Sequence, residues 1–148
     1  MATRHHARMA VVSLLYAYDL GNGSIAEHSE SILEEKKIRN KQKDFALALF
    51  DGVMENLEAC DKSIIEHLKE WDFERLGAIE RATLRLASYE ILFGELDSAV
   101  VINEAVEITK AFGTEQSPKF INGVLDAISK DQAKPKEEVK PEIQDKTE

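Results

Sequence analysis

Apolar side chains recur every three or four positions along most of the first 130 residues, which is the spacing of one face of an α-helix. Thr3 precedes the first such stretch and is a residue type that caps helices, whereas Gly21 stands where that stretch stops. No segment alternates with the period of two that a β-strand requires, and no proline interrupts the chain before Pro118. The pattern therefore predicts an all-α protein.

The helical stretches are separated by residues that favour turns and helix starts. Ser24 opens the second stretch, Asp97 or Ser98 caps a later one, and Ser117 with Pro118 begins the last. We expect helices over approximately residues 3–20, 24–40, 46–71 (as one helix or two), within 72–98, 98–113 and 117–130. These stretches predict a compact bundle of about six or seven helices joined by short connections.

Two expectations about packing depend on this pattern. In the stretch 72–98, we expect one set of residues to form a buried helix face and a second set to lie outside that face. The buried residues are Ile79, Ala82, Leu86 and Phe93, and the residues off that face are Glu80, Arg81, Arg85 and Ser88. Gly123 lies inside the last helix, where glycine costs about 1 kcal/mol relative to alanine, and we expect close helix packing to require it.

The composition is typical of one soluble, globular domain over residues 1–130. The chain of 148 residues is 43% hydrophobic and 32% charged, with a formal net charge of −9. Cys60 is the single cysteine, which excludes an internal disulfide and a four-cysteine zinc site and favours a reducing, cytoplasmic environment. No signal-peptide pattern is present, and the apolar runs are too short to span a membrane. Residues 131–148 are charged and contain two prolines, and we expect a disordered tail there.

No group of residues indicates catalysis, a metal site or a cofactor site. Cys60 and His67 lie two helical turns apart, but a lone buried cysteine is usually a packing residue. His28 and His67 each follow a glutamate without completing the HExxH pattern of zinc proteases, and the glycine-rich loops that hold phosphates are missing. The sequence therefore predicts a non-catalytic protein without a cofactor.

The leading end of this acidic chain carries positive charge and has no carboxylate before Asp19. Arg4 and Arg8 are one helical turn apart and can face one direction, with His5 and His6 between them. Cations at a helix N-terminus oppose the helix dipole and cost roughly a few tenths of a kcal/mol. An RNA or DNA partner would explain that cost, because arginine binds two phosphate oxygens at once. A solvated, frayed end is the alternative, and the residues alone leave both open.

Two further segments carry candidate cations. The first contains Lys36, Lys37, Arg39, Lys41 and Lys43. Cations there complement the dipole at the end of the second helix, and we favour that interpretation over a nucleic-acid site. In the second segment, GTEQSPKFING, Lys119 and the backbone N–H groups at a helix start can face an anion. Phe120 could stack on a base, although an aromatic residue at this position is more typical of the core.

Three longer motifs resemble one protein family. They are ARMAVVSLLYAYD from Ala7, RLGAIERATLRLASYEI from Arg75 and VINEAVEITKAFGTEQSPKFINGVLDAI from Val101. Together they resemble the NusB family of transcription antitermination proteins over residues 3 to about 130, least closely in 21–45. The resemblance implies an all-helical fold of two packed three-helix bundles plus the N-terminal helix. It also implies pairing with NusE, a small-subunit ribosomal protein, and joint binding to the boxA element of leader RNA. RNA polymerase then resists termination, notably in ribosomal RNA operons.

The resemblance also implies which residues form the binding sites. The RNA-facing set is Arg4, His5, His6, Arg8, Tyr16, Gln116, Lys119 and Phe120. The NusE-facing set is Glu74, Glu80, Arg81, Arg85 and Glu107. NusE is basic as a class, so an acidic face for it would account for part of the net charge.

Three positions in the RNA-facing set depart from the family pattern. His5 and His6 stand where arginines are frequent, which predicts weaker or pH-sensitive RNA binding, since histidine is mostly neutral above about pH 6.5. Gln116 stands where aspartate is frequent, and the loss of a carboxylate beside phosphates should favour binding.

Two other functions stay open. Certain ribosomal RNA cytosine methyltransferases carry a NusB-like domain, but no second domain with a cofactor-binding loop follows residue 130 in this sequence. In the other alternative, the chain is a protein-only helical scaffold whose basic end is incidental. Self-association also stays open, because some NusB-like proteins form dimers that could occlude the RNA surface.

Overall fold

The computed structural model describes residues 3–69, 72–112 and 114–132, and the regular elements within them are all helical. The elements are α1 (Arg4–Asp19), α2 (Ile25–Glu35), α3 (Lys41–Glu55), α4 (Leu57–Glu66), the 3₁₀ helix η1 (Phe73–Arg75), α5 (Ala78–Phe93), α6 (Ser98–Phe112) and α7 (Ser117–Gln132). The predicted all-α class is confirmed for these residues. None of the helices in this described part combines the length and the apolar character that a membrane span requires. Trp71, Gly113 and residues 133–148 of the predicted tail lie outside the described residues, whereas Asp131 and Gln132, the first two residues of that tail, belong to α7.

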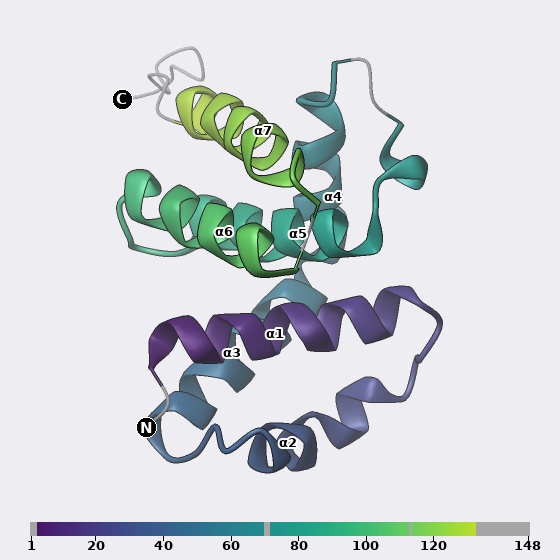
Figure 1. Cartoon of the computed structure of the whole chain (residues 1–148), viewed down its shortest axis with the longest axis vertical. Coiled ribbons are helices and arrows are strands. Elements are labelled where there is room, and N and C mark those ends of the chain that lie inside the picture. Colours follow the sequence, from purple (N-terminus) through teal and green to yellow (C-terminus); the bar gives the residue numbers. More distant parts are fainter. Residues whose placement is uncertain (1–2, 70–71, 113, 133–148) are drawn as a thin grey trace, which may run out of the picture.

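The helices form two tiers that share α5 (Figure 1). The lower tier contains α1, α2 and α3, and the upper tier contains α4, α6 and α7 around α5. One buried apolar cluster includes Phe50 of the lower tier and Leu86 of α5, and a second includes Leu125 of the upper tier and Leu84 of α5. Because α5 contributes side chains to both clusters, it is the element that joins the tiers.

The start of α1 is capped as the sequence predicts. The Thr3 hydroxyl accepts the backbone N–H of His6 at 3.2 Å, and Nδ1 of His6 accepts the backbone N–H of Thr3 at 3.3 Å. This reciprocal capping box satisfies two of the free donors at the helix start. The first turn contains no acidic residue. It is therefore a capped helical turn rather than a frayed end, and its charge is positive.

The connection between α2 and α3 departs from the predicted helix over 24–40. α2 ends at Glu35, and Lys37 and Asn40 adopt left-handed backbone φ angles of 64° and 58°. The backbone N–H groups of Lys36, Lys37 and Ile38 donate to carbonyls in the last turn of α2. Ile38 is buried, whereas the side chains on either side of it are exposed. The segment 36–40 is thus an anchored connection with its charges at the surface.

α5 is buried over most of its circumference, which corrects the predicted division of this helix. Arg85 and Ser88, which the pattern places off the buried face, are 7% and 0% exposed, whereas Phe93 is 50% exposed. The reason is the central position of α5, because helices of both tiers pack around it. Phe93 is its last residue and lies beyond that cover.

Close packing requires glycine at Gly52 rather than at Gly123. A Cβ atom on Gly52, in α3, would overlap the phenol group of Tyr89 on α5. A Cβ atom on Gly123 would meet no atom within 4 Å among the described residues, so the packing explanation for that glycine is wrong. α3 therefore approaches α5 closely at Gly52, while Gly123 only lowers the helix propensity of α7.

We expect opposite effects from alanine at these two glycines. Gly123→Ala should raise the free energy of unfolding by about 0.5–1 kcal/mol. Gly52→Ala gains a similar helix propensity but displaces the Tyr89 ring, and overpacking costs roughly 1–3 kcal/mol, so we expect a net loss of about 1 kcal/mol. Urea denaturation of both variants makes the comparison, and equal shifts for the two would contradict the packing argument.

Candidate nucleic-acid interface

α1 is fixed on α5 by a buried ion pair. The Nε and Nη2 atoms of Arg8 donate to the two carboxylate oxygens of Glu90, each at 2.8 Å, and the residues are 4% and 6% exposed. The hydrogen bonds to Glu90 raise the pKa of Arg8 above its usual value, against the opposing effect of burial. This geometry contradicts the expected phosphate contact of Arg8, because its guanidinium is enclosed and already holds a carboxylate.

A second, partly buried ion-pair network lies at the other end of α1. Asp19 accepts hydrogen bonds from Arg81 and Arg85 of α5. Arg85 also donates to both carboxylate oxygens of Asp61 in α4, at 2.8 and 2.9 Å, and Arg81 donates to the carbonyl of Phe73 at 2.8 Å. Burial acts to raise the pKa of Asp19, but the hydrogen bonds and charges of the two arginines outweigh it and lower that pKa. Both guanidiniums already hold partners within this chain, which leaves them fewer donors for a protein partner, and the partner-facing role of Arg81 and Arg85 stays a prediction.

The first turn of α1 keeps part of the predicted RNA-facing set at the surface. Arg4 is exposed and lies over the ring of Phe45, with its Cζ atom 4.6 Å from the ring centroid. His5 is half-buried, and its Nδ1 atom lies 2.8 Å from a carboxylate oxygen of Glu104 in α6. His6 is exposed. Arg4 and His6 therefore have the access that a phosphate contact needs.

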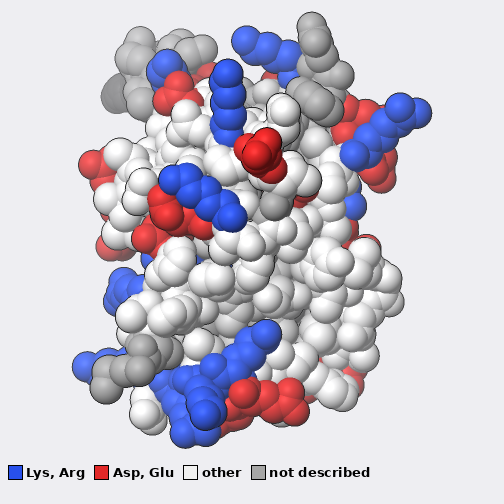
Figure 2. Space-filling view, viewed as in Figure 1, with Lys and Arg blue, Asp and Glu red and all other residues white. Residues whose placement is uncertain are grey.

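A groove of about 600 Å³ lies between α1 and the α2–α3 connection, and we name it the connection groove. Its lining residues are His6, Met9, Ala10 and Ser13 of α1, Lys36, Lys37, Ile38 and Arg39 of the connection, and Phe112 at the end of α6. Figure 2 shows lysine and arginine side chains gathered at this lower-left end of the molecule. Tyr16 continues the face of α1 that carries His6 and Ser13 and is 37% exposed. The fold thus brings together two basic segments that are far apart in the sequence.

A second groove collects the predicted residues of the α6–α7 region, and we name it the loop groove. It has a volume of about 680 Å³. Its lining residues are Arg75, Leu76, Gly77, Glu80, Thr114, Glu115, Gln116, Ser117, Lys119 and Phe120. Gln116 and Lys119 are exposed, whereas Phe120 is half-buried and packs against the upper core. These three residues come from one short segment at the start of α7, and the fold places them beside Glu80 of α5.

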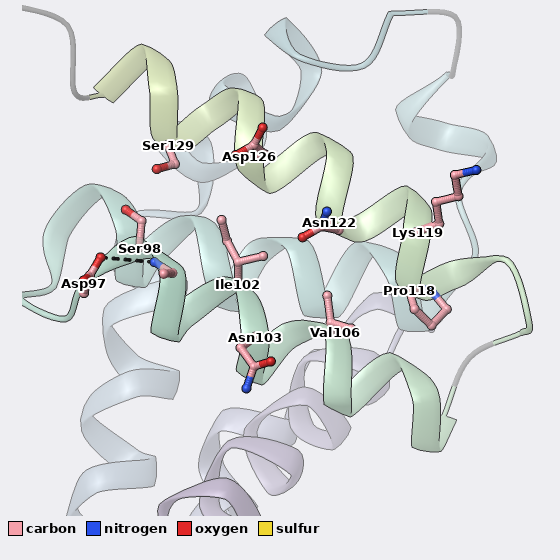
Figure 3. Close-up of a pocket in the computed structure, with 11 residues that line it drawn as sticks. Asp97, Ser98, Ile102, Asn103, Val106, Pro118, Lys119, Asn122, Asp126 and Ser129 are labelled. Carbon is pink, nitrogen blue, oxygen red and sulfur yellow. Dashed lines mark hydrogen bonds between the residues drawn. The ribbon is translucent and has the colours of Figure 1, made fainter.

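Lys119 also borders a third groove, which runs between the outer faces of α6 and α7 and measures about 720 Å³. Figure 3 shows Lys119 at one end of this groove and Asp97 at the other, with Asn103 and Asn122 between them. Asp97 caps α6, as the sequence predicts, by accepting the backbone N–H of Ala99 at 3.2 Å. The cationic end of the groove is therefore the end that adjoins the loop groove.

The predicted partner-facing glutamates differ in their surroundings. Glu74 is exposed on η1, and Glu107 is exposed on α6, where it lies 3.2 Å from the ammonium of Lys110. Glu80 is half-buried and accepts a hydrogen bond from the Ser117 hydroxyl, which is therefore directed at α5. Glu74 and Glu107 remain accessible acidic groups, whereas Glu80 also joins α5 to the start of α7.

The thiol–imidazole pair considered for Cys60 and His67 is not assembled. Cys60 is fully buried, and burial raises the pKa of its thiol to about 12, so it is not a thiolate at neutral pH. His67 directs Nδ1 to the carbonyl of Ser63 at 2.7 Å and Nε2 to Asp131 at 3.1 Å. Within the described residues, no group of three or more metal-ligating side chains is present.

The comparisons with known sequences agree on one family. The model of the NusB family matches residues 5–130. A transcription antitermination protein NusB of Sulfurimonas denitrificans is 85% identical over 131 residues, which cover 88% of this chain and 99% of the relative. A protein of the same name from Nitratiruptor sp. is 65% identical over 131 residues, covering 88% and 94% respectively. The resemblance predicted from the three motifs is confirmed.

Solved structures share the fold. A structure described as T. maritima NusB is 39% identical with a TM-score of 0.78, and the match covers 93% of this chain and 97% of that one. A structure described as the antitermination factors NusB and NusE in complex with dsRNA is 35% identical with a TM-score of 0.79, covering 86% and 96%. These matches confirm the helical fold over nearly all of the described residues.

The Arg8–Glu90 pair gives a prediction that separates a structural role from a binding role. Arg8→Met leaves Glu90 buried without a partner and should lower the free energy of unfolding by about 3–5 kcal/mol. The double variant Arg8→Met with Glu90→Leu should recover most of that loss, because it removes both buried charges. Guanidinium denaturation of the single and double variants tests this. A single variant as stable as the wild type would show that the pair does not hold α1 on α5.

Proposed function

The chain belongs to the NusB family, and we propose that it is a transcription antitermination factor that binds boxA RNA together with the ribosomal protein NusE. The proposal is supported by the relatives that carry the name of an antitermination protein and by a related structure described as a complex of NusB, NusE and RNA. In this role the chain is a non-catalytic adaptor of the antitermination complex of RNA polymerase. It would act in the cytoplasm on leader transcripts, notably those of ribosomal RNA operons.

The proposed RNA surface runs along the exposed face of α1 and continues at the loop groove. Arg4 and His6 would contact phosphates, and Tyr16, on the same helix as His6, offers an exposed ring to an unpaired base. Lys119 would supply a further phosphate contact, with Gln116 beside it. Five of the eight predicted residues thus carry the proposal through their own exposure.

The remaining three predicted RNA-facing residues have different roles in this proposal. Phe120 acts mainly through the upper core and supports the position of Lys119. His5 approaches RNA only if its contact with Glu104 opens. Arg8 positions α1 on α5 and does not touch RNA.

NusE would bind an acidic surface near the loop groove. Glu74 is exposed there on η1, one residue from Arg75 in the groove lining, and Glu80 lines the groove itself. Glu107 offers a further carboxylate on α6. Opposite charges speed encounter and set the orientation of two proteins, so a basic NusE is suited to this side of a chain with a net charge of −9. Arg81 and Arg85 shape this surface from beneath through their contacts with Asp19 and Asp61.

The exposed cations of α1 and α7 provide the test of the proposal. Arg4→Ala with Lys119→Ala should weaken binding of boxA RNA about tenfold, and the salt dependence should flatten by about 0.7 in slope for each phosphate that the variant no longer neutralises. Fluorescence titration of labelled boxA RNA, with and without NusE and at two salt concentrations, measures both quantities.

A matched control removes the same charge elsewhere. Lys62→Ala with Lys69→Ala changes two exposed lysines at α4 and just after it and should leave the affinity within about twofold of the wild type. Unchanged affinity and slope in the Arg4 and Lys119 double variant would overturn the assignment of these residues. Binding of NusE by a wild-type protein that binds no RNA would favour the protein-only scaffold.

A further inference from the structure

We propose that the connection groove binds the phosphate backbone of a single-stranded RNA segment next to the boxA element, and so lengthens the RNA contact. The inference rests on the proposed function, because it requires RNA to be present at the start of α1. It assigns a binding role to Lys36, Lys37 and Arg39, whose position after α2 could otherwise reflect the helix dipole alone.

The charges of the groove are available to a ligand. The groove lining contains no carboxylate, and within the described part of the chain neither Lys36 nor Lys37 has an ion-pair partner. Arg39 lies 3.6 Å from Glu34, but both side chains are largely exposed, and such pairs contribute little. Lys43 differs, because its ammonium lies 3.0 Å from Glu30 and 2.8 Å from Glu34. Of the cations in the segment 36–43, Lys43 is therefore neutralised by carboxylates, whereas Lys36, Lys37 and Arg39 line the groove and keep their charge available.

Hydrogen bonding to the end of α2 does not account for these side chains. The carbonyls at the end of α2 already accept backbone N–H groups, from Lys36 to Ile32 and Leu33, from Lys37 to Glu34, and from Ile38 to Leu33. The carbonyls of Ile32, Leu33 and Glu34 are thus capped by the backbone of the connection, and lysine side chains are not needed as their hydrogen-bond donors.

The backbone of the connection also favours a ligand-binding interpretation. Lys37 has a φ of 64°, a conformation in which glycine or asparagine is more favourable than lysine. Glycine or asparagine would stabilise this turn better than lysine does, so the turn itself does not explain a lysine at position 37. Ile38, 4% exposed, anchors the segment in the lower core, so the adjacent cations are held in place before a ligand binds.

The wall opposite the cations suits a nucleic-acid chain. Phe112 is 40% exposed at the end of α6, and His6 and Ser13 line the groove from α1. Single-stranded nucleic acids bind along cationic tracks in which exposed aromatic rings stack on bases. His6 belongs to both this groove and the first turn of α1, so a strand that contacts Arg4 can continue into the groove without leaving the surface.

The test compares RNAs of two lengths with the full chain bound to NusE. One RNA carries the boxA element alone, and the others add about eight unstructured nucleotides at the 5′ or the 3′ end, a length in the range of single-strand sites. We expect one extension to raise the affinity of the wild type about tenfold. The triple variant Lys36→Gln, Lys37→Gln, Arg39→Gln should show no such increase, bind the short RNA as the wild type does, and have a salt slope lower by about 2 for the longer RNA.

The control triple variant Lys62→Gln, Lys69→Gln, Lys130→Gln removes the same charge outside the groove lining and should keep the increase in affinity. The inference is overturned if neither extension strengthens binding by the wild type, if the groove variant keeps the increase, or if its affinity falls equally for both RNAs. Loss of NusE binding without RNA would assign the groove to a protein partner and also overturn it. Failure of the wild type to bind even the short RNA would instead overturn the proposed function.

A single substitution separates binding from folding at the same position. Lys37→Asn keeps a residue that tolerates the left-handed conformation and should leave the melting temperature unchanged or higher. It should nevertheless reduce the affinity for the extended RNA about two- to threefold. A lower melting temperature with unchanged affinity would show that Lys37 serves the fold alone.

Discussion

The structure depends on the antiparallel pairing of α1 with α5, which a buried ion pair fixes at one end and a partly buried one fixes at the other. Arg8, near the start of α1, binds Glu90 near the end of α5, and Asp19, at the end of α1, binds Arg81 near the start of α5. Removing one partner of the buried Arg8–Glu90 pair costs about 3–5 kcal/mol, and together with the Asp19–Arg81 contact this pair selects one register between the two helices. Because α1 belongs to the lower tier and α5 joins both, they also hold the tiers in one arrangement.

The same pairing decides which charges of α1 reach the surface. Arg8 is turned inward, whereas Arg4, one turn earlier, is exposed on the ring of Phe45. Asp19, the first carboxylate of the chain, is directed at two arginines of α5 and adds little negative charge to the exposed face of α1. A chain with a net charge of −9 can thus present a cationic region to RNA, because screening limits the reach of distant carboxylates to about 8 Å.

Much of the fold was predictable from the sequence because helix periods and caps are local signals. Thr3 and Asp97 cap the helices that the sequence assigns to them, and the three motifs indicate the family. Contacts between residues on different helices were not predictable. The spacing of one helical turn places Arg4 and Arg8 on the same face of α1, but it does not indicate which of the two pairs with Glu90. Gly52 was missed for the same reason, since its close neighbour Tyr89 lies on another helix.

The candidate site was predictable only in part. Lys119 and the start of α1 stand out by charge, whereas the connection groove forms only when the fold places the segment 36–39 beside His6. The local signals were the cations of the segment 36–43 and Ile38, the apolar residue among them that anchors the segment in the core.

Amide chemical-shift mapping by NMR tests the central claim most directly, namely that RNA binds the face of α1 that its pairing with α5 leaves exposed. On titration of the labelled chain with boxA RNA, the largest shifts are predicted at Arg4, His6, Tyr16 and Lys119, with smaller ones along α4. Shifts centred on α4, with none in the first turn of α1, would contradict the account.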